Sequence, residues 1–295
     1  GETPEKTAPA PAAPAEEAGW SKPIPIGFSI DYTVVSDYVW RGINLSEYKG
    51  EGREKINQQL GIGISYDAGK LGTFSGSFWF EWYSGQDNAA FGGGKHHLQE
   101  VDYTLSWSYD IPETPLSVEL GWIAYQFPFL KGDPQWTHEV YVSLSVDDGA
   151  LLRLLGCNVD GPILSPYVTY YHDLDDVQAG WLEIGISHEF ALAELGMGGV
   201  PILKDTTLTP SLVLGIDHNY YDKLGVGSTN GQGTRLGNLQ YGIDATVDLS
   251  SVFGIPEKYG SLSLTGFLRF SQALHDQNVA VQDEFYGGVT IGYEW

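Results

Sequence analysis

The chain has 295 residues, with 38 Asp or Glu against 15 Lys or Arg, so its formal net charge is -23. This excess of acid argues against binding to nucleic acid or to anionic lipid headgroups, because both partners are polyanions. The single cysteine, Cys157, excludes an intrachain disulfide. No stretch approaches about 18 uninterrupted apolar residues, so the sequence predicts no transmembrane helix.

Residues 1–24 are rich in proline and alanine, most clearly in the run from Ala8 to Ala15. Such a segment cannot bury a hydrophobic core and is expected to be extended and disordered. We therefore divide the chain into a leader, 1–24, and one folded domain, 25–295. The leader is interpreted either as a periplasmic spacer that contacts the cell wall or, more commonly for such a composition, simply as a disordered leader.

From residue 27 onward, apolar and polar side chains alternate with the period of two that is typical of β-strands. The pattern is clearest over 72–83, where Phe78 and Phe80 lie on one face and Ser77 and Glu81 on the other. The segment around Ala150–Leu155 is expected to form one helical turn. The predicted strands are 27–40, 56–66, 72–83, 98–109, 115–126, 136–147, 163–172, 179–190, 207–218, 238–249, 260–271 and 283–295.

These strands have the length of a tilted crossing of a bilayer, and short turns alternate with longer polar links between them. The pattern predicts an all-β fold, an antiparallel up-and-down transmembrane β-barrel of about 12 strands. A soluble β-sandwich with a polar outer face is the alternative. Aromatic residues at strand ends favour the barrel, because such residues form girdles at membrane interfaces. The candidates are Tyr38, Trp40, Trp82, Trp107, Trp122, Trp136, Tyr293 and Trp295.

The final strand reads D-E-F-Y-G-G-V-T-I-G-Y-E-W, with Phe285, Val289, Ile291 and Trp295 on one face. This segment resembles the C-terminal signature of bacterial outer-membrane β-barrels, in which the terminal aromatic is part of the assembly signal. The resemblance implies a bacterial outer-membrane location, surrounding lipid, and recognition by the barrel assembly machinery. An even number of strands places both termini, and therefore the leader, in the periplasm.

Residues 36–46 read S-D-Y-V-W-R-G-I-N-L-S. This segment resembles the S-x-Y-x-[FW]-R-G-I-S signature of the TorF family of bacterial porins, a family that is itself named by prediction. The chain departs from the signature at Asn44, where the family usually has serine. The glycine- and aromatic-rich segment Thr73–Trp82 is also similar. The resemblance implies an outer-membrane pore and names no substrate.

Alternation also predicts which charged side chains face the lumen. An excess of carboxylates in a confined aqueous channel concentrates cations and repels anions. The predicted basic lumen residues are Arg41 and Arg269. The acidic ones are Asp31, Asp37, Glu81, Glu100, Asp102, Glu119, Glu139, Glu183, Glu189, Asp217, Asp244, Asp248 and Glu294.

Asp37 and Arg41 are expected on the lumen face near the outer mouth of the first strand. One interpretation is a charged constriction that selects ions. The other is an ion pair or hydrogen-bonded clamp that fixes the adjoining loop, which is the more frequent role of charges inside a narrow barrel.

Twelve strands predict a narrow bore, intermediate between a filled eight-stranded barrel and a wide porin. The predicted function is an outer-membrane porin that passes small solutes or ions through an acidic, cation-preferring lumen. The alternative is a non-conducting structural or adhesive barrel. No enzyme activity, cofactor or metal site is expected, since the lipid-facing His138 has no serine partner in the expected register. The oligomeric state is left open.

Overall fold

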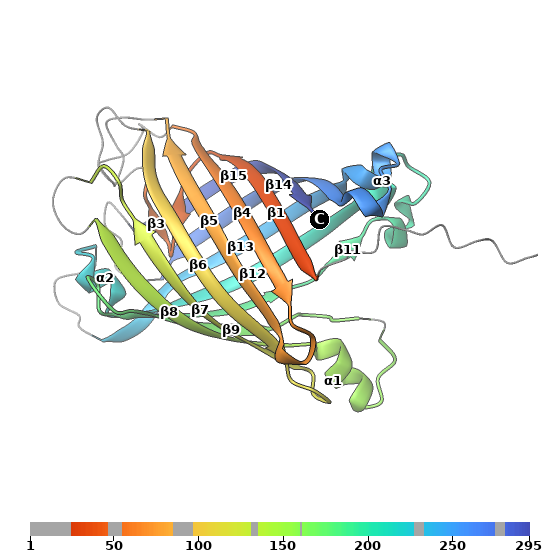
Figure 1. Cartoon of the computed structure of the whole chain (residues 1–295), viewed down its shortest axis with the longest axis horizontal. Helices are drawn as coiled ribbons and strands as arrows, with labels where there is room; N and C mark the ends of the chain where they lie inside the picture. The colour runs from red at the N-terminus through yellow and green to blue at the C-terminus, as the bar shows by residue number, and fades with distance from the viewer. Residues whose placement is uncertain are drawn as a thin grey trace, which may run out of the picture.

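The structure, a computed structural model, describes residues 25–46, 55–84, 97–130, 135–159, 161–226, 233–274 and 281–295. The leader expected at 1–24 lies outside these residues. Twelve long strands form one closed antiparallel barrel (Figure 1). They are β1 (Ile26–Val35), β4 (Asn57–Asp67), β5 (Thr73–Tyr83), β6 (Leu98–Asp110), β7 (Leu116–Gln126), β8 (Trp136–Val146), β9 (Tyr167–Asp173), β10 (Gly180–Ser187), β12 (Thr206–His218), β13 (Thr234–Asp248), β14 (Ser261–Ala273) and β15 (Glu284–Glu294).

Consecutive long strands pair with each other, and β15 returns to pair with β1, with Ile30 opposite Tyr293. The short strand β11 (Phe190–Ala191) extends the pairing of β12 beyond the end of β10. Closure leaves no long strand edge unpaired, as a spanning barrel requires. The predicted twelve-stranded barrel is confirmed, and the two-sheet sandwich is wrong.

The largest error in the predicted strands is at the first, which was expected to reach Trp40. Strand β1 ends at Val35, and the chain then forms a separate hairpin from β2 (Val39–Trp40) and β3 (Ile43–Asn44). The side chains of residues 36–40 still alternate between two faces, but these residues lead into the hairpin and are not part of the barrel wall. Periodicity alone therefore overestimated the length of β1.

Large apolar side chains cover the outer face of the wall. Ile64 is 56% exposed, Leu105 60% and Phe285 68%. These positions alternate with inward-facing serine, threonine, glycine and acidic residues, such as Ser77 and Thr104. So large an exposed apolar surface is unfavourable in water and matches the hydrocarbon layer of a membrane. The alternation in the sequence therefore separates a lipid face from a lumen face.

Replacing Leu105 with Arg is expected to reduce the free energy of unfolding by about 2–4 kcal/mol, because it places a charge against lipid tails. The measurement is urea-induced unfolding in phospholipid vesicles. Thr104→Arg, one residue away on the inward face, is the matched control and should have a smaller effect. Equal destabilisation by both variants would contradict the assignment of the two faces.

The two ends of the barrel differ in their connections (Figure 1). One end, here called the turn end, carries the C-terminus, α1 (Asp148–Leu154), α3 (Leu249–Phe253) and the short helical turns Gly69–Leu71, Ala193–Met197, Leu203–Asp205 and Glu257–Tyr259. The opposite loop end carries α2 (Tyr220–Lys223). The helical turn expected near Ala150 is confirmed as α1. Among the described residues, no helix is both long and apolar enough to cross a bilayer.

The loop end contains a buried cluster inside the barrel, here called the plug cluster. Its aromatic members Trp181, Tyr220 and Tyr221 have side chains that are at most 1% exposed. The full set is Ile43, Leu45, Val177, Ala179, Trp181, Tyr220, Tyr221, Val226 and Val281. The cluster joins the β2–β3 hairpin, the β9–β10 link and α2. At this end, connecting segments that fold into the barrel therefore fill part of its interior.

Tyr38 and Trp40 pack against the plug cluster, so their prediction as membrane-interface residues is wrong. The Tyr38 ring lies 5.4 Å from the ring of inward-facing Trp79. Trp40 lies 5.5 Å from Tyr220 and 6.2 Å from Tyr125. The chain leaves the barrel wall after Val35, so Tyr38 and Trp40 lie inside the barrel although they continue the alternation of β1.

Candidate functional site: a charged constriction inside the barrel

The β2–β3 hairpin turns at the dipeptide Arg41-Gly42. Both residues have positive φ, 51° at Arg41 and 76° at Gly42, which is the pattern of a two-residue type I′ turn. A β-carbon at residue 42 would lie 3.0 Å from both the Asn238 β-carbon and the Tyr221 hydroxyl. Glycine is therefore required both for the turn and for the close approach, and the turn directs Arg41 into the barrel.

Arg41 forms a two-pronged ion pair with Glu139, which projects inward from β8. Its two terminal guanidinium nitrogens donate to the two carboxylate oxygens at 2.6 and 2.9 Å. The Glu139 carboxylate also accepts hydrogen bonds from the Tyr125 and Tyr220 hydroxyls, each at 2.8 Å. The side chains of Arg41 and Glu139 are 4% and 0% exposed. The paired geometry and the two hydroxyls offset the desolvation of both charges.

Aromatic rings surround the Arg41 guanidinium. Its central carbon lies 4.4 Å from the centroid of Trp40, 4.6 Å from that of Tyr220 and 4.8 Å from that of Tyr171. A cation over the face of an aromatic ring is attracted by the ring quadrupole, and more strongly where water is excluded. Arg41 therefore links the hairpin to the wall through both charge and stacking.

Asp217 fixes helix α2 against this hairpin. Its carboxylate accepts from the backbone N–H groups of Tyr220 and Tyr221, at 2.5 and 3.1 Å, and from Arg235 Nε at 2.8 Å. The Tyr221 hydroxyl in turn donates to the Arg41 carbonyl oxygen at 2.5 Å. Asp217 faces inward as predicted by alternation, but it is fully buried and holds α2 in place.

A group of acidic side chains lies beside the hairpin. Glu81 and Glu100 are 2% and 3% exposed, and Asp102 follows on the same inward face of β6. Among the described residues, none of these three carboxyl groups forms an ion pair with Lys or Arg, and Glu100 interacts with Tyr38 and with Asp102. This side of the lumen therefore holds three acidic side chains that interact with one another and, within the described part of the chain, with no basic side chain.

The remaining predicted lumen residues lie at different levels of the barrel. Arg269 pairs with Asp244 at 2.6 Å. Glu119 accepts a hydrogen bond from the Tyr141 hydroxyl. Glu183 accepts one from Trp181 Nε1 at 3.1 Å. Of the others, Asp31 lies on the inward face of β1, Asp37 accepts a 3.5 Å hydrogen bond from Asn44, and Glu189, Asp248 and Glu294 are exposed.

Asp37 and Arg41 were expected together on the face of the first strand, and this expectation is wrong because both follow the end of β1. The structure instead brings Arg41 together with Glu139, which lies on β8 and is 98 residues away along the chain. The clamp interpretation of Arg41 describes its contacts.

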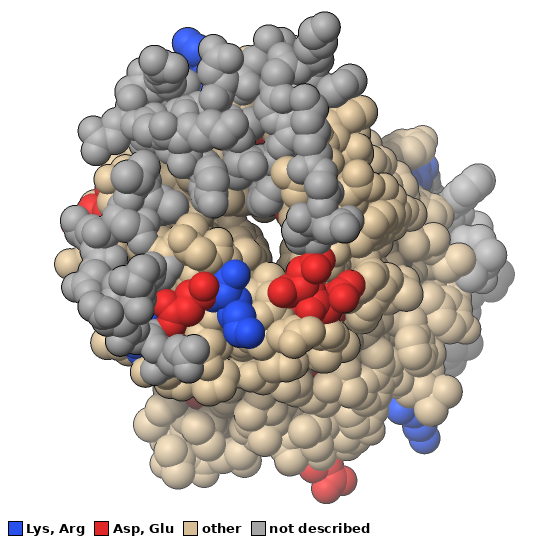
Figure 2. All heavy atoms as spheres, turned by 90° about the vertical axis from the view of Figure 1, so that its left-hand side faces the viewer, with Lys and Arg blue, Asp and Glu red and all other residues tan. Residues whose placement is uncertain are grey.

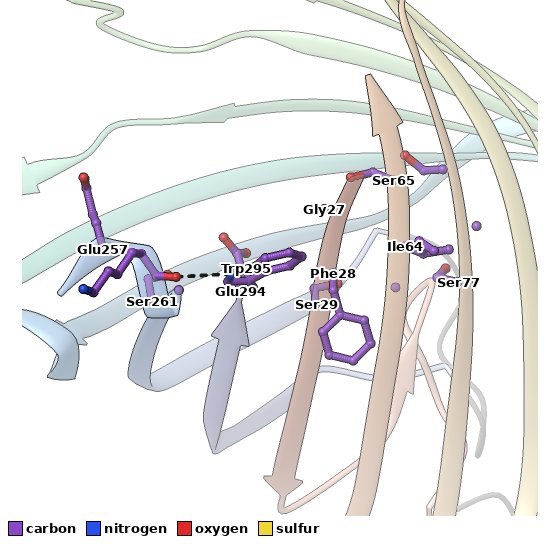
Figure 3. Close-up of a pocket in the computed structure, with 15 residues that line it drawn as sticks. Gly27, Phe28, Ser29, Ile64, Ser65, Ser77, Glu257, Ser261, Glu294 and Trp295 are labelled. Atoms are coloured by element: carbon purple, nitrogen blue, oxygen red, sulfur yellow. Dashed lines mark hydrogen bonds between the residues drawn. The ribbon is translucent and has the colours of Figure 1, made fainter. Parts of the chain in front are cut away.

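At the turn end, a cavity of about 830 Å³ lies beside the C-terminus (Figure 3). Ser29, Ser65 and Ser77 line it from the wall, together with Glu257 and Glu294. In Figure 3, the Trp295 indole donates a 3.3 Å hydrogen bond to the Lys258 carbonyl oxygen. Hydroxyl groups therefore line part of this pocket, and the outward-facing Phe28 and Ile64 line another part.

Figure 2 looks onto the loop end and shows acidic and basic side chains beside a small opening. The arginine pairs of this region, Arg41 with Glu139 and Arg235 with Asp217 and Asp222, come from the hairpin and from β13.

Arg235 is an inward-facing charge that the sequence analysis missed. A strand from 238 was predicted, whereas β13 begins at Thr234, and its register against β12 shifts between Gly215 and Ile216. Asn238 pairs with Gly215 but Leu236 pairs with Ile216, so Gly237 is the extra residue of a bulge. The bulge reverses the alternation and turns Arg235 inward. The isolated glycine was the signal that could have indicated it.

Among the other predicted interface aromatics, Trp82 and Trp136 lie at strand ends, whereas Trp122 lies directly opposite Leu105, away from the strand ends. Trp82 stacks on Phe80 at 5.7 Å, and Trp136 is 39% exposed at the start of β8. Trp122 stacks on His138 at 5.5 Å. At the turn end, three aromatics donate hydrogen bonds to backbone carbonyls, namely Trp107 to Leu71, Tyr293 to Tyr259 and Trp295 to Lys258.

Replacing Gly42 with Ala is expected to weaken docking of the hairpin by about 1–2 kcal/mol, because alanine is strained at this positive φ. Hydrogen exchange of the Leu45 amide, which donates to the Tyr38 carbonyl, is the measurement and should accelerate about tenfold. Gly69→Ala is the control, since φ there is also positive, at 61°, but no atom lies within 4 Å of the added carbon. Unchanged exchange in the Gly42 variant would contradict the role of the turn.

Neither a protein-family model nor a curated protein matches the sequence. Among solved structures, the chain is similar to the COG4313 outer membrane channel from Pseudomonas putida F1, with a TM-score of 0.51, 9% identity and coverage of 96% of this chain and 100% of that one. Weaker similarities are to the KdgM porin, with a TM-score of 0.44, 13% identity and coverage of 90% and 98%, and to the NanC porin, with 0.46, 9%, 90% and 98%. The resemblance to the TorF family stays a prediction. The chain thus has the fold of an outer-membrane β-barrel.

Proposed function

We propose that the protein is a bacterial outer-membrane channel that passes small solutes or ions through a narrow, acidic and cation-preferring lumen. The observation that carries this proposal is the imbalance of charge inside the barrel. The inward-facing arginines Arg41, Arg235 and Arg269 are each paired with a carboxylate. Further carboxylates that are partly exposed in the lumen, including Asp31 and Glu119, remain outside those pairs. A surplus of negative charge in a low-dielectric wall attracts cations.

The proposed path runs from the serine-lined cavity at the turn end to the constriction at Arg41. Asp31, Glu119 and Glu183 lie on the inward faces between these points, and their side chains are partly exposed. We place the turn end, with the C-terminus and the leader, in the periplasm, where the barrel assembly machinery recognises the final strand. The girdle aromatics then contact the two lipid interfaces.

Single-channel recording of the purified protein in a planar bilayer, under a salt gradient, tests this proposal. We expect a steady conductance with a reversal potential of the sign given by cation preference. Anion preference would contradict the acidic path. Absence of conductance in protein that resists unfolding by SDS without heat would contradict the channel itself.

A non-conducting structural or adhesive barrel is the second candidate, and the buried plug cluster favours it. Trp181, Tyr220 and Tyr221 fill part of the loop end, and their close packing reduces the space for solutes. We propose no enzyme activity for either candidate. His138 lies between the rings of Trp122 and Trp136, at 5.5 and 6.5 Å, which supports a role in packing at the membrane interface.

A further inference from the structure

Two turns at the turn end share one construction. The tripeptide Lys70-Leu71-Gly72 leads into β5, and Lys258-Tyr259-Gly260 leads into β14. In each case the lysine lies in a single 3₁₀ turn that ends at the glycine, and φ of this glycine is 85° at Gly72 and 84° at Gly260. The same sequence pattern and the same local backbone therefore occur twice around the barrel.

The two glycines allow the neighbouring strand to approach each turn closely. A β-carbon at Gly72 would collide with the Ser108 carbonyl oxygen on β6, and one at Gly260 would collide with the Glu294 carbonyl oxygen on β15. A positive φ is also strained for a residue that carries a β-carbon. Conformation and contact thus both require glycine, and each turn is held against the next strand of the wall.

Aromatic side chains of that neighbouring strand fix the level of each turn. The Trp107 indole donates to the Leu71 carbonyl oxygen at 2.7 Å, and the Tyr293 hydroxyl donates to the Tyr259 carbonyl oxygen, also at 2.7 Å. Trp107 and Tyr293 belong to the outward-facing series of β6 and β15. Indole and phenol side chains in such positions lie at the level of lipid headgroups, so the two turns lie there as well.

Each turn presents a lysine beside a large exposed side chain. Lys70 and Lys258 are exposed, and neither forms an ion pair within the described part of the chain. Leu71 is 69% exposed and Tyr259 is 59% exposed. At a membrane interface, lysine places its alkyl stem along apolar surface and its ammonium among the headgroups. The phosphate of a phospholipid is the anion available there.

The same groups line hollows in the surface. Beside the second turn, a groove of about 450 Å³ is lined by Lys258, Tyr259, Tyr293 and Trp295. The Trp295 indole donates to the Lys258 carbonyl oxygen, which holds the groove together (Figure 3). Beside the first turn, a hollow of about 540 Å³ is lined by Lys70 and, among others, by Tyr109. Each lysine thus has adjacent space for a headgroup.

Carboxylates accompany both lysines and indicate which headgroup fits. Asp67 lines the same hollow as Lys70, and Glu257 directly precedes Lys258. Both carboxylates are exposed. The net charge of -23 disfavours an anionic lipid. A headgroup with a phosphate and an ammonium group matches the pair, because the phosphate accepts from lysine and the ammonium donates to the carboxylate.

We propose that each of these two turns binds the headgroup of one zwitterionic phospholipid. The phosphate contacts Lys70 or Lys258, the ammonium contacts Asp67 or Glu257, and the acyl chains follow the apolar outer wall. The proposal rests on the lipid-facing wall of the barrel and not on conduction. It therefore stands or falls separately from the channel function.

Native mass spectrometry of the folded, detergent-solubilised full chain tests the proposal by counting bound lipids. The probes are phosphatidylethanolamine, phosphatidylglycerol and diacylglycerol with identical acyl chains. We expect two molecules of phosphatidylethanolamine to bind saturably, with each of the other two lipids at least about tenfold weaker. Equal affinity for diacylglycerol would assign binding to apolar contact alone and overturn the proposal. Tighter binding of phosphatidylglycerol would overturn the choice of a zwitterionic headgroup.

Three variants localise the two sites. Lys70→Met and Lys258→Met keep the length of the side chain and remove the ammonium group, so each should release one of the two lipids, and the double variant should release both. Lys223→Met is the control, because it removes an exposed lysine of α2 at the loop end and should leave both lipids bound. Retention of both lipids by the double variant, or an equal loss in Lys223→Met, would overturn the assignment.

Discussion

Replacing Arg41 with Ala is expected to raise the single-channel conductance severalfold. Glu139, which is fully buried, would lose its only ion-pair partner among the described residues. Removing one member of a buried pair costs about 3–5 kcal/mol, because the other charge remains buried without compensation. The least costly response is release of the β2–β3 hairpin, which rehydrates Glu139 and widens the constriction. Planar-bilayer recording measures the change.

Arg153→Ala is the control for this variant. Arg153 pairs with Asp147 at 3.7 Å at the turn end, and both side chains are about half exposed, at 45% and 46%. Exposed pairs of this kind contribute about 1 kcal/mol or less, so the conductance should not change. Unchanged conductance in Arg41→Ala would contradict the clamp.

A double variant separates loss of the ion pair from loss of packing. Arg41→Met with Glu139→Gln keeps a long side chain against the aromatic rings and an acceptor for the Tyr125 and Tyr220 hydroxyls. We expect its conductance to be closer to that of the wild type than the conductance of Arg41→Ala, because no buried charge is left alone. A larger effect than in the single variant would indicate that packing, and not charge, holds the hairpin.

Neutralising Asp31, Glu119 and Glu183 together, as Asn, Gln and Gln, is expected to move the reversal potential toward zero. Two unit charges about 4 Å apart interact by about 1 kcal/mol in bulk water, which corresponds to about a fivefold change in local cation concentration. The three side chains are partly exposed within the lumen, so each acts on a passing ion. Recording at low ionic strength keeps this interaction unscreened.

The control for charge is the triple variant Asp67→Asn, Glu113→Gln and Glu194→Gln. These three side chains are exposed at the turn end, and the variant changes the net charge by the same amount. Its reversal potential should match that of the wild type. Equal shifts in the two triple variants would show that the overall charge of the protein, and not the lumen, sets selectivity.

The wall of this barrel was predictable because each strand has two chemically different environments. Leu105 faces lipid and Thr104 faces the lumen, and the same alternation of apolar and polar side chains recurs along the strands of the barrel. The hairpin at 39–44 was not distinguished from the wall, because its own alternation continues that of β1. The bulge at Gly237 reverses which side chains of β13 face inward before and after it, and a strict period of two cannot predict such a reversal.

The interior contacts were beyond sequence reasoning for a different reason. Arg41 meets Glu139 because β8 lies across the lumen from the hairpin, and no local pattern specifies which strand lies opposite. Tyr220 and Tyr221 lie in the link between the predicted strands 207–218 and 238–249, where no helix was expected, yet Asp217 accepts hydrogen bonds that fold the start of this link into α2. A long-range partner, and not intrinsic propensity, decides the conformation of this segment.

The position of the hairpin has a consequence for the order of biogenesis. The turn at Arg41-Gly42 is local, so the hairpin can form as soon as its residues are free to pair. Its docking partners come from β8 and from the link after β12, and β1 itself gains its second neighbour only when β15 pairs with it. Contacts between segments so distant in sequence form slowly. Burial of Trp181 and Tyr220 is therefore a late step, and fluorescence from these side chains would report completed assembly and not membrane insertion.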